Sequence, residues 1–188
     1  MTALFSLWLP ILLSAVVVFI ISSLVHMVIK WHAGDYGNVA NEDAVRAAIN
    51  AGHLAPGRYV IPHCKDMKEM SSPEMVKKYQ EGPVMHFTVL APGVPNMGKY
   101  LGQWFVWSLV VSTVAACITV RLYGLAHVPV LGAAKLIFAI TLIAHGFGTV
   151  TESIWTGRPW SSSIKYLLDA LLYALGAAAI FYWLWPRS

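Results

Sequence analysis

The stretch LWLPILLSAVVVFIISSLVHMVI, residues Leu7–Ile29, contains no Lys, Arg, Asp or Glu. A helix that crosses a bilayer needs about 20 largely apolar residues, because its backbone polar groups find no partner in lipid and must bond within the segment. The stretch is longer than the apolar region of a secretory signal, about 7–15 residues, so we interpret it as a retained anchor. Three further stretches predict spanning helices: Leu101–Leu122, Leu136–Trp155 and Tyr166–Trp185.

The composition of the 188-residue chain points to the same class of protein. Hydrophobic residues make up 57% of the chain and charged residues 12%, whereas a soluble domain is about 45–50% apolar and about 25% charged. Fifteen of the 22 charged residues lie between Lys30 and Lys99. We therefore expect a transmembrane helix over residues 1–29, a polar extramembrane domain over residues 30–100, and three more transmembrane helices over residues 101–188.

The polar segment carries signals for two helices and two strands. Asn41 before two acidic residues, and Ser72 before Pro73, are typical helix starts. Tyr59–Ile61 and Val84–Leu90 favour short strands. Because so small a segment buries little surface, we expect it to rest against the membrane helices or a partner. The sequence therefore predicts an all-α membrane protein, a four-transmembrane-helix bundle with a small α+β extramembrane insertion between helices 1 and 2.

The Lys and Arg residues near the helix ends predict the orientation. Cytoplasmic ends carry the excess of these residues, and five on the side of the polar segment face three on the side of the termini. We expect a multi-pass protein of a bacterial inner (plasma) membrane with a cytoplasmic polar domain. The two sets are Lys30, Arg46, Lys99, Arg158 and Lys165, against Arg121, Lys135 and Arg187.

Several function classes lack their signatures in this sequence. No G-x-x-x-x-G-K-[ST], G-x-S-x-G or H-E-x-x-H motif occurs, so enzymatic activity is the last function that we consider. The two cysteines, Cys64 and Cys117, fall in different segments, which argues against a disulfide framework. The net charge of +4 lies largely beside the spans. That basicity suits anionic lipid headgroups in the bilayer rather than nucleic acid.

Four ionisable residues inside the predicted spans form our first candidate site. His26, Glu152 and Asp169 each lie three residues from a helix end on the same side of the membrane, and His145 lies two turns deeper than Glu152. Such residues normally face a bundle interior or a pore. The cluster has the chemistry to bind a transition metal, to relay protons or to ligate haem. The alternative is polar packing between helices, or contact with the headgroup layer.

A second group follows the first span directly and contains His26, His32, Asp35 and Tyr36. On a continuing helix, His32 and Asp35 share a stripe, but His26 aligns with neither of them. We interpret this group as ordinary juxtamembrane polarity.

The third group lies in the polar segment and combines thiol, thioether and imidazole donors, which favour reduced copper. Its spacing matches no defined site, and the charged residues between its members also fit a solvated loop and helix. The proposed copper ligands are His63, Cys64, Met67, Met70 and His86.

Small and hydroxyl residues recur in the predicted spans and let helix backbones approach closely in lipid. They predict a tight bundle or contact with another membrane protein. The interface candidates are Ser108, Ser112, Gly146, Gly148 and Gly176.

Three functions follow from these features. The leading hypothesis is a non-catalytic accessory or assembly subunit of a larger, energy-transducing membrane complex, bound to other membrane protein subunits. The competing hypothesis is a protein that binds or transfers copper or haem. The third is a small proton-coupled transporter in which Asp169 and Glu152 carry the proton.

Overall fold

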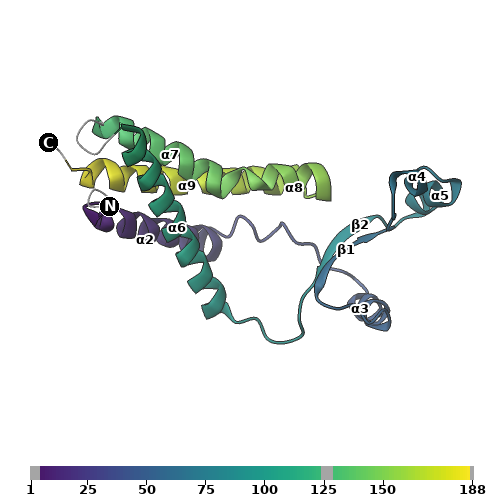
Figure 1. Cartoon of the computed structure of the whole chain (residues 1–188). Coiled ribbons are helices and arrows are strands. Elements are labelled where there is room, and N and C mark those ends of the chain that lie inside the picture. Colours follow the sequence, from purple (N-terminus) through teal and green to yellow (C-terminus); the bar gives the residue numbers. More distant parts are fainter. Residues whose placement is uncertain (1–4, 124–128, 187–188) are drawn as a thin grey trace. The chain divides into compact units, whose positions relative to one another are not determined.

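Four helical segments of the chain are long and apolar enough to cross a membrane, and the protein is an integral, multi-pass membrane protein (Figure 1). The computed structural model describes residues 5–123 and 129–186. The predicted fold class, an all-α four-helix membrane bundle with a small insertion, is confirmed. The segments are α2 (Trp8–Ser23) continued by the π-helical turn η1 (Leu24–Ile29), α6 (Met97–Tyr123), α7 (Val130–Gly146) followed by α8 (Gly148–Thr156), and α9 (Trp160–Leu184).

Three helices begin earlier than the apolar stretches from which they were predicted, and α6 does so by four residues. α7 starts directly after Pro129 and α9 directly after Pro159, six residues before the predicted starts. The mean hydropathy of these first turns is low because they contain glycine, serine or lysine. These residues are small or polar, but a helix accommodates them. In α9 the backbone N–H of Ser163 bonds to the Pro159 carbonyl and closes the first turn.

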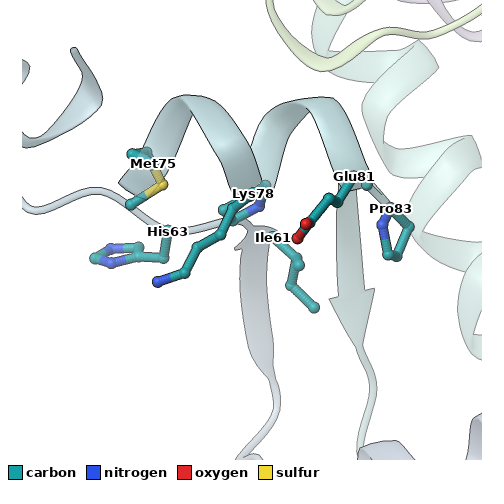
Figure 2. A pocket seen from close by; sticks show the side chains of 8 residues that line it. Ile61, His63, Met75, Lys78, Glu81 and Pro83 are labelled. Carbon is teal, nitrogen blue, oxygen red and sulfur yellow. The ribbon is translucent and has the colours of Figure 1, made fainter. Parts of the chain in front are cut away.

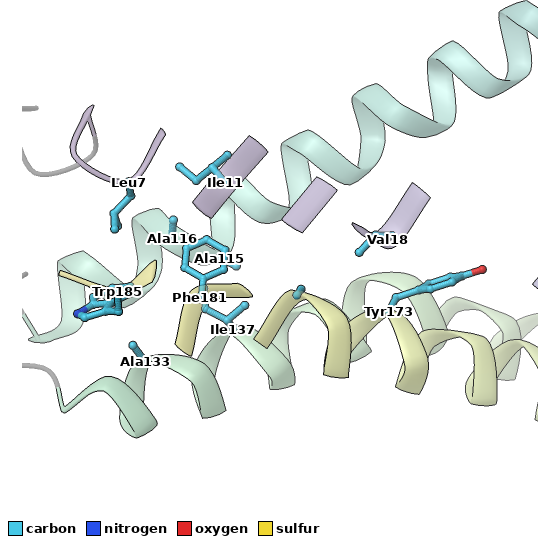
Figure 3. Close-up of a cluster of buried hydrophobic side chains, with 11 residues drawn as sticks. Leu7, Ile11, Val18, Ala115, Ala116, Ala133, Ile137, Tyr173, Phe181 and Trp185 are labelled. Atoms are coloured by element: carbon cyan, nitrogen blue, oxygen red, sulfur yellow. The ribbon is translucent and has the colours of Figure 1, made fainter. Parts of the chain in front are cut away.

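The bundle is centred on α9, which packs along α7 and α2, while α6 lies against α2 and α7. The hydroxyls of Ser14 on α2 and Ser112 on α6 hydrogen-bond at 2.7 Å. Ser108, one turn earlier on α6, is buried and donates to the Trp104 carbonyl. Figure 3 shows the apolar core, which includes Leu7, Ile11, Val18, Ala115, Ala116, Ala133, Ile137, Tyr173, Ala177, Phe181 and Trp185.

Two glycines lie where neighbouring helices come close to α9. A Cβ added at Gly146 would lie 2.9 Å from the Cβ of Ala170, where α7 meets α9. A Cβ added at Gly176 would lie 2.7 Å from Cδ1 of Ile21 on α2. At Gly148, in the first turn of α8, nothing lies within 4 Å of that position. Close backbone approach is the usual role of glycine between helices in lipid.

The insertion is built around a two-stranded antiparallel sheet. Gly57 pairs with Val89 at one end of the sheet and Ile61 with Met85 at the other. Ser72 caps one helix by accepting a hydrogen bond from the Met75 N–H, as its position before a proline predicts. The elements are α3 (Glu42–Ala51), β1 (Gly57–Ile61), α4 (Met67–Met70), α5 (Pro73–Glu81) and β2 (Met85–Val89), of which α4 was not predicted.

The chain divides into two compact units, and the insertion unit has almost no apolar core of its own. The membrane unit includes the first helix together with the residues up to Tyr36, beyond the predicted end of the first span. The insertion unit comprises Gly37–Pro95 with Ile154–Gly157. Within Gly37–Pro95, all of which the structure describes, Met75 is the only buried hydrophobic side chain.

We expect Gly146→Ala to lower the free energy of unfolding by about 1–2 kcal/mol, because Ala170 has no rotatable bond that would move its Cβ away. Gly148→Ala is the matched control and should be neutral or stabilising, since Ala is the better helix former by about 1 kcal/mol. Thermal unfolding of the two variants in detergent micelles measures the difference. Equal effects would contradict the close packing of α7 on α9.

Candidate metal centre

The first span ends in a reversal of the chain that determines where the next polar residues lie. α2 passes into the π-helical turn η1, and Lys30 then adopts the left-handed conformation, with φ 56°. The Lys30 N–H bonds to the Val25 carbonyl at 2.9 Å, and the Ala33 N–H bonds back to Lys30. Single π-helical turns are frequent at functional sites. Because the helix ends at Ile29, Trp31 and His32 do not continue along its axis. Their side chains instead contact Asp169 on α9.

Asp169 on α9 is the centre of the polar cluster and is only 1% exposed. Its Oδ1 accepts a hydrogen bond from Nε1 of Trp31 at 3.0 Å. Its Oδ2 lies 2.8 Å from Nε2 of His32. A carboxylate inside a membrane-spanning helix is costly unless it is paired, and both of its partners come from the reversal after the first span. Asp169 therefore depends on residues that lie 137 and 138 positions away in the sequence.

His32 lies between two carboxylates. Its Nδ1 is 2.7 Å from Oδ2 of Asp35, while its Nε2 faces Asp169. A neutral imidazole has one N–H donor, so both short contacts are satisfied only when a second proton or another cation joins the group. The short contact between the His32 ring and Asp169 therefore calls for one additional positive charge, either a proton or another cation.

His26 completes a group of three ligand atoms. Its Nδ1 lies 3.0 Å from the Ser22 carbonyl, which only accepts, so Nδ1 carries the hydrogen and Nε2 offers a lone pair. Nε2 is 3.9 Å from Oδ2 of Asp169, and the ring stacks on His32 with centroids 4.9 Å apart. One ligand atom from each of His26, His32 and Asp169 lies within 4.8 Å of the others. In residues 5–123 and 129–186, no other His, Cys or acidic side chains form such a group.

Asp35 holds His32 in place and is itself held by the first turns of α9. Its Oδ1 accepts from Nζ of Lys165 at 2.5 Å and its Oδ2 from Oγ of Ser162 at 3.0 Å. The Lys165 ammonium, and then His32, lower the pKa of the Asp35 carboxyl from 3.8 to about 2. Asp35 is therefore ionised at neutral pH, and it draws the Nδ1 hydrogen of His32 toward itself.

The structure brings three of the four predicted intramembrane residues to one cavity and pairs the fourth elsewhere. Glu152 on α8 forms an ion pair with Arg158 at 2.6 Å, and Arg158 also lies over the ring of Tyr166, 4.9 Å from its centroid. Because α9 begins at Trp160, Asp169 is nine residues into its helix, about 13 Å along the axis, rather than three. The cavity, of about 270 Å³, is lined by Ser22, His26, Trp104, His145, Tyr166, Asp169 and Tyr173.

The predicted copper ligands lie in the insertion, where their imidazole and thiol donors do not converge. His63 borders a cavity of about 300 Å³ between the end of β1 and α5, beside Lys78 (Figure 2). The Cys64 thiol lies 3.2 Å from the Tyr79 hydroxyl. His86 is on β2, where it pairs with Val60. Met67 and Met70 are both exposed.

Sequence reasoning interpreted His32 and Asp35 as ordinary juxtamembrane polarity, yet His32 is the residue with the shortest contact to Asp169. The helical spacing that separated His26 from His32 does not apply, because the chain reverses at Lys30. The three-residue spacing of His32 and Asp35 was visible, and this pair is in contact. No local signal linked the pair to α9.

Comparisons with protein-family models, curated proteins and solved structures find no match for this chain. We therefore infer the function from the geometry of the polar cluster. Two imidazoles and a buried carboxylate that meet at one point can hold a cation or share protons.

We expect the coupling energy between Asp35 and Lys165 to be constant from pH 8 to about pH 5. It should then fall toward zero near pH 2, because the contribution of a carboxyl with a lowered pKa is lost between its unfolded and folded values. A double-mutant cycle of Asp35→Asn and Lys165→Gln, measured by thermal unfolding, separates the coupling energy of this pair from the contributions of the other partners of Asp35. A coupling already lost at pH 5 would contradict the ion pair.

Proposed function

We propose that the protein binds one divalent transition-metal ion, zinc or ferrous iron, through Nε2 of His26, Nε2 of His32 and Oδ2 of Asp169. The proposal is carried by one observation: a ligand atom of each residue lies within 4.8 Å of the others, and both Nε2 atoms face Oδ2 of Asp169. Two histidines and one carboxylate are the ligand set of many catalytic zinc sites and of non-haem iron sites. Because all three donors are nitrogen or oxygen, the site suits these ions rather than reduced copper, which prefers sulfur.

Each proposed ligand also has a partner on the side away from the metal position. The Nδ1 hydrogen of His26 faces the Ser22 carbonyl, and that of His32 faces Asp35. Oδ1 of Asp169 accepts from Trp31. Such outer contacts select the tautomer and orient the ring, and metal-ligating histidines nearly always have them. A cluster that only packed helices together would not require every Nε2 to point to one place.

The spacing of the ligand atoms is compatible with one ion after small side-chain movements. Ligands around a tetrahedral zinc at about 2.05 Å are about 3.3 Å apart. The distance between His32 and Asp169 is 2.8 Å and that between His26 and Asp169 is 3.9 Å. Three protein ligands leave a position for water or a substrate, as in catalytic rather than structural sites. The two carboxylates and Lys165 together leave one negative charge unmatched, and a bound cation would offset it.

We expect the full-length protein, purified in detergent, to contain about one zinc or iron ion per chain. His32→Ala and Asp169→Asn should abolish this binding, and Asp35→Ala should weaken the affinity about 10–100-fold because it removes the orienting partner. His63→Ala, at an exposed histidine of the insertion, is the matched control and should bind normally. Elemental analysis and titration with cobalt(II), whose visible absorption reports imidazole ligation, measure both effects.

A wild-type chain that contains no metal after growth in metal-rich medium, and that does not take up cobalt(II), would exclude the site. If the His63→Ala variant lost the metal while the His32→Ala variant bound it normally, the metal site would lie in the insertion instead.

We propose as a second function that the chain is an accessory subunit of a larger complex in a bacterial plasma membrane, with the insertion on the cytoplasmic face. The insertion supports this proposal because Met75 is its only buried hydrophobic side chain within Gly37–Pro95. Leu90 and Val94 are 72% and 95% exposed. A unit with so little core gains stability when a partner covers its apolar surface. Five Lys and Arg residues near the spans on the insertion side favour the cytoplasmic orientation.

We expect the tagged chain, isolated from native membranes in mild detergent, to carry at least one other membrane protein in native mass spectrometry. Val94→Glu should release that partner and leave the metal content unchanged, because Val94 lies outside the metal cluster. Gln80→Glu, which adds the same single negative charge at an exposed position of α5, is the control. A wild-type chain that is isolated alone would contradict the subunit proposal and leave the metal proposal standing.

A further inference from the structure

The cavity beside the metal ligands is formed by all four spans. Ser22 and His26 come from the first span and Trp104 from α6. His145 comes from α7, and α9 contributes Tyr166, Asp169 and Tyr173. Its volume is about 270 Å³. Cavities between the helices of a bundle, with mostly apolar walls and a few polar groups, are the usual form of a small-molecule site.

Aromatic rings form much of the wall of this cavity. The rings of Trp104, His145 and Tyr173 meet one another edge to face, with centroids 5.5 Å, 5.9 Å and 5.6 Å apart. Aromatic pairs prefer such offset or edge-on arrangements, so a wall of this kind favours another flat ring. A cavity of about 150 Å³ is enough to hold benzene. The cavity beside Asp169 is large enough for one substituted ring.

Two of the wall residues carry buried polar atoms that have no partner in the described part of the chain. They are Nε1 of Trp104 and Nε2 of His145. The Trp104 N–H can only donate. The Nδ1 of His145 lies 3.0 Å from the Thr141 carbonyl and therefore carries the hydrogen, so Nε2 is an acceptor in the neutral ring. Buried polar groups are nearly always paired, so an unpaired donor and an unpaired acceptor on two residues that line one cavity point to a bound molecule that supplies both partners.

We propose that this cavity binds the hydroxylated ring of a phenol or quinol that enters from the lipid. A single hydroxyl group accepts from the Trp104 N–H and donates to Nε2 of His145, and the aromatic walls enclose the ring. A carbonyl or ether oxygen would satisfy Trp104 but leave His145 without a partner. A hydrocarbon ring would satisfy neither atom. Binding of the ring requires the cavity and these two atoms but does not require the metal.

The first test compares three probes on the full-length wild-type chain in lipid nanodiscs. Phenol offers both hydrogen bonds, anisole only the acceptor oxygen, and toluene neither. We expect the affinity to fall about tenfold from phenol to anisole and again to toluene, since each lost hydrogen bond to a buried group costs about that factor. Ligand-observed NMR titrations measure the binding, after subtraction of the partition of each probe into empty nanodiscs. Equal affinities for the three probes would overturn the proposal.

The second test removes the polar ring atoms of one wall residue at a time and keeps an aromatic ring at that position. Trp104→Phe and His145→Phe should each weaken phenol binding about tenfold and leave toluene binding nearly unchanged. The matched controls are Trp183→Phe, at an exposed position of α9, and His63→Phe in the insertion. Phenol binding equal to that of the wild type in both cavity variants would overturn the assignment. If either variant fails to fold, the ranking of probes on the wild-type chain decides the question.

A third titration separates this inference from the proposed metal site. Phenol should bind equally well to chain that is stripped with EDTA and to chain loaded with zinc. Binding only by the zinc-loaded chain would show that the metal holds the hydroxyl, and it would overturn the role of Trp104 and His145. Equal binding by a chain that takes up no metal would exclude the metal proposal and support the cavity.

Discussion

The buried carboxylate of Asp169 is the constraint on which this end of the bundle depends. A charge inside a spanning helix is stable only when partners replace the water that it has lost. α9 supplies no local partner that does this, and the Trp31 indole and the His32 imidazole come from the other end of the chain. The first helix ends at Ile29 and the chain turns at Lys30, and both groups then reach Asp169.

The same constraint accounts for the polar first turns of α9. Ser162 and Lys165 would weaken a purely apolar span, yet both bind Asp35, which in turn orients His32 toward Asp169. The hydrogen bonds thus form a closed loop from α9 to the segment after the first helix and back to α9. Such a loop fixes the position of a ring more firmly than a single contact does, because each group is held on two sides. That rigidity is what a metal site requires of its ligands.

The two units of the chain divide the chemistry between them. The membrane unit contains the polar cluster, the aromatic cavity and the buried apolar core, whereas the insertion buries one hydrophobic side chain of its own. The membrane unit has an apolar core of its own. A unit with as little core as the insertion gains stability when another surface covers its apolar side chains. The proposed metal site and the proposed partner therefore concern different parts of the protein, and neither depends on the other.

The sequence by itself determined the four spans, the two strands and the capped helix of the insertion, because hydropathy, alternation and capping are local properties. It also singled out His26 and Asp169, since ionisable residues are rare in apolar stretches. It grouped Glu152 with them by depth along the helices, but the nearby Arg158 pairs with that carboxylate. Only the tertiary structure decided that His32 and Asp35 belong to the cluster. The physical reason is that His32 and Asp169 are in contact although they lie 137 positions apart in the sequence. Local periodicity carries no information about where a helix ends and the chain turns back toward such a distant partner.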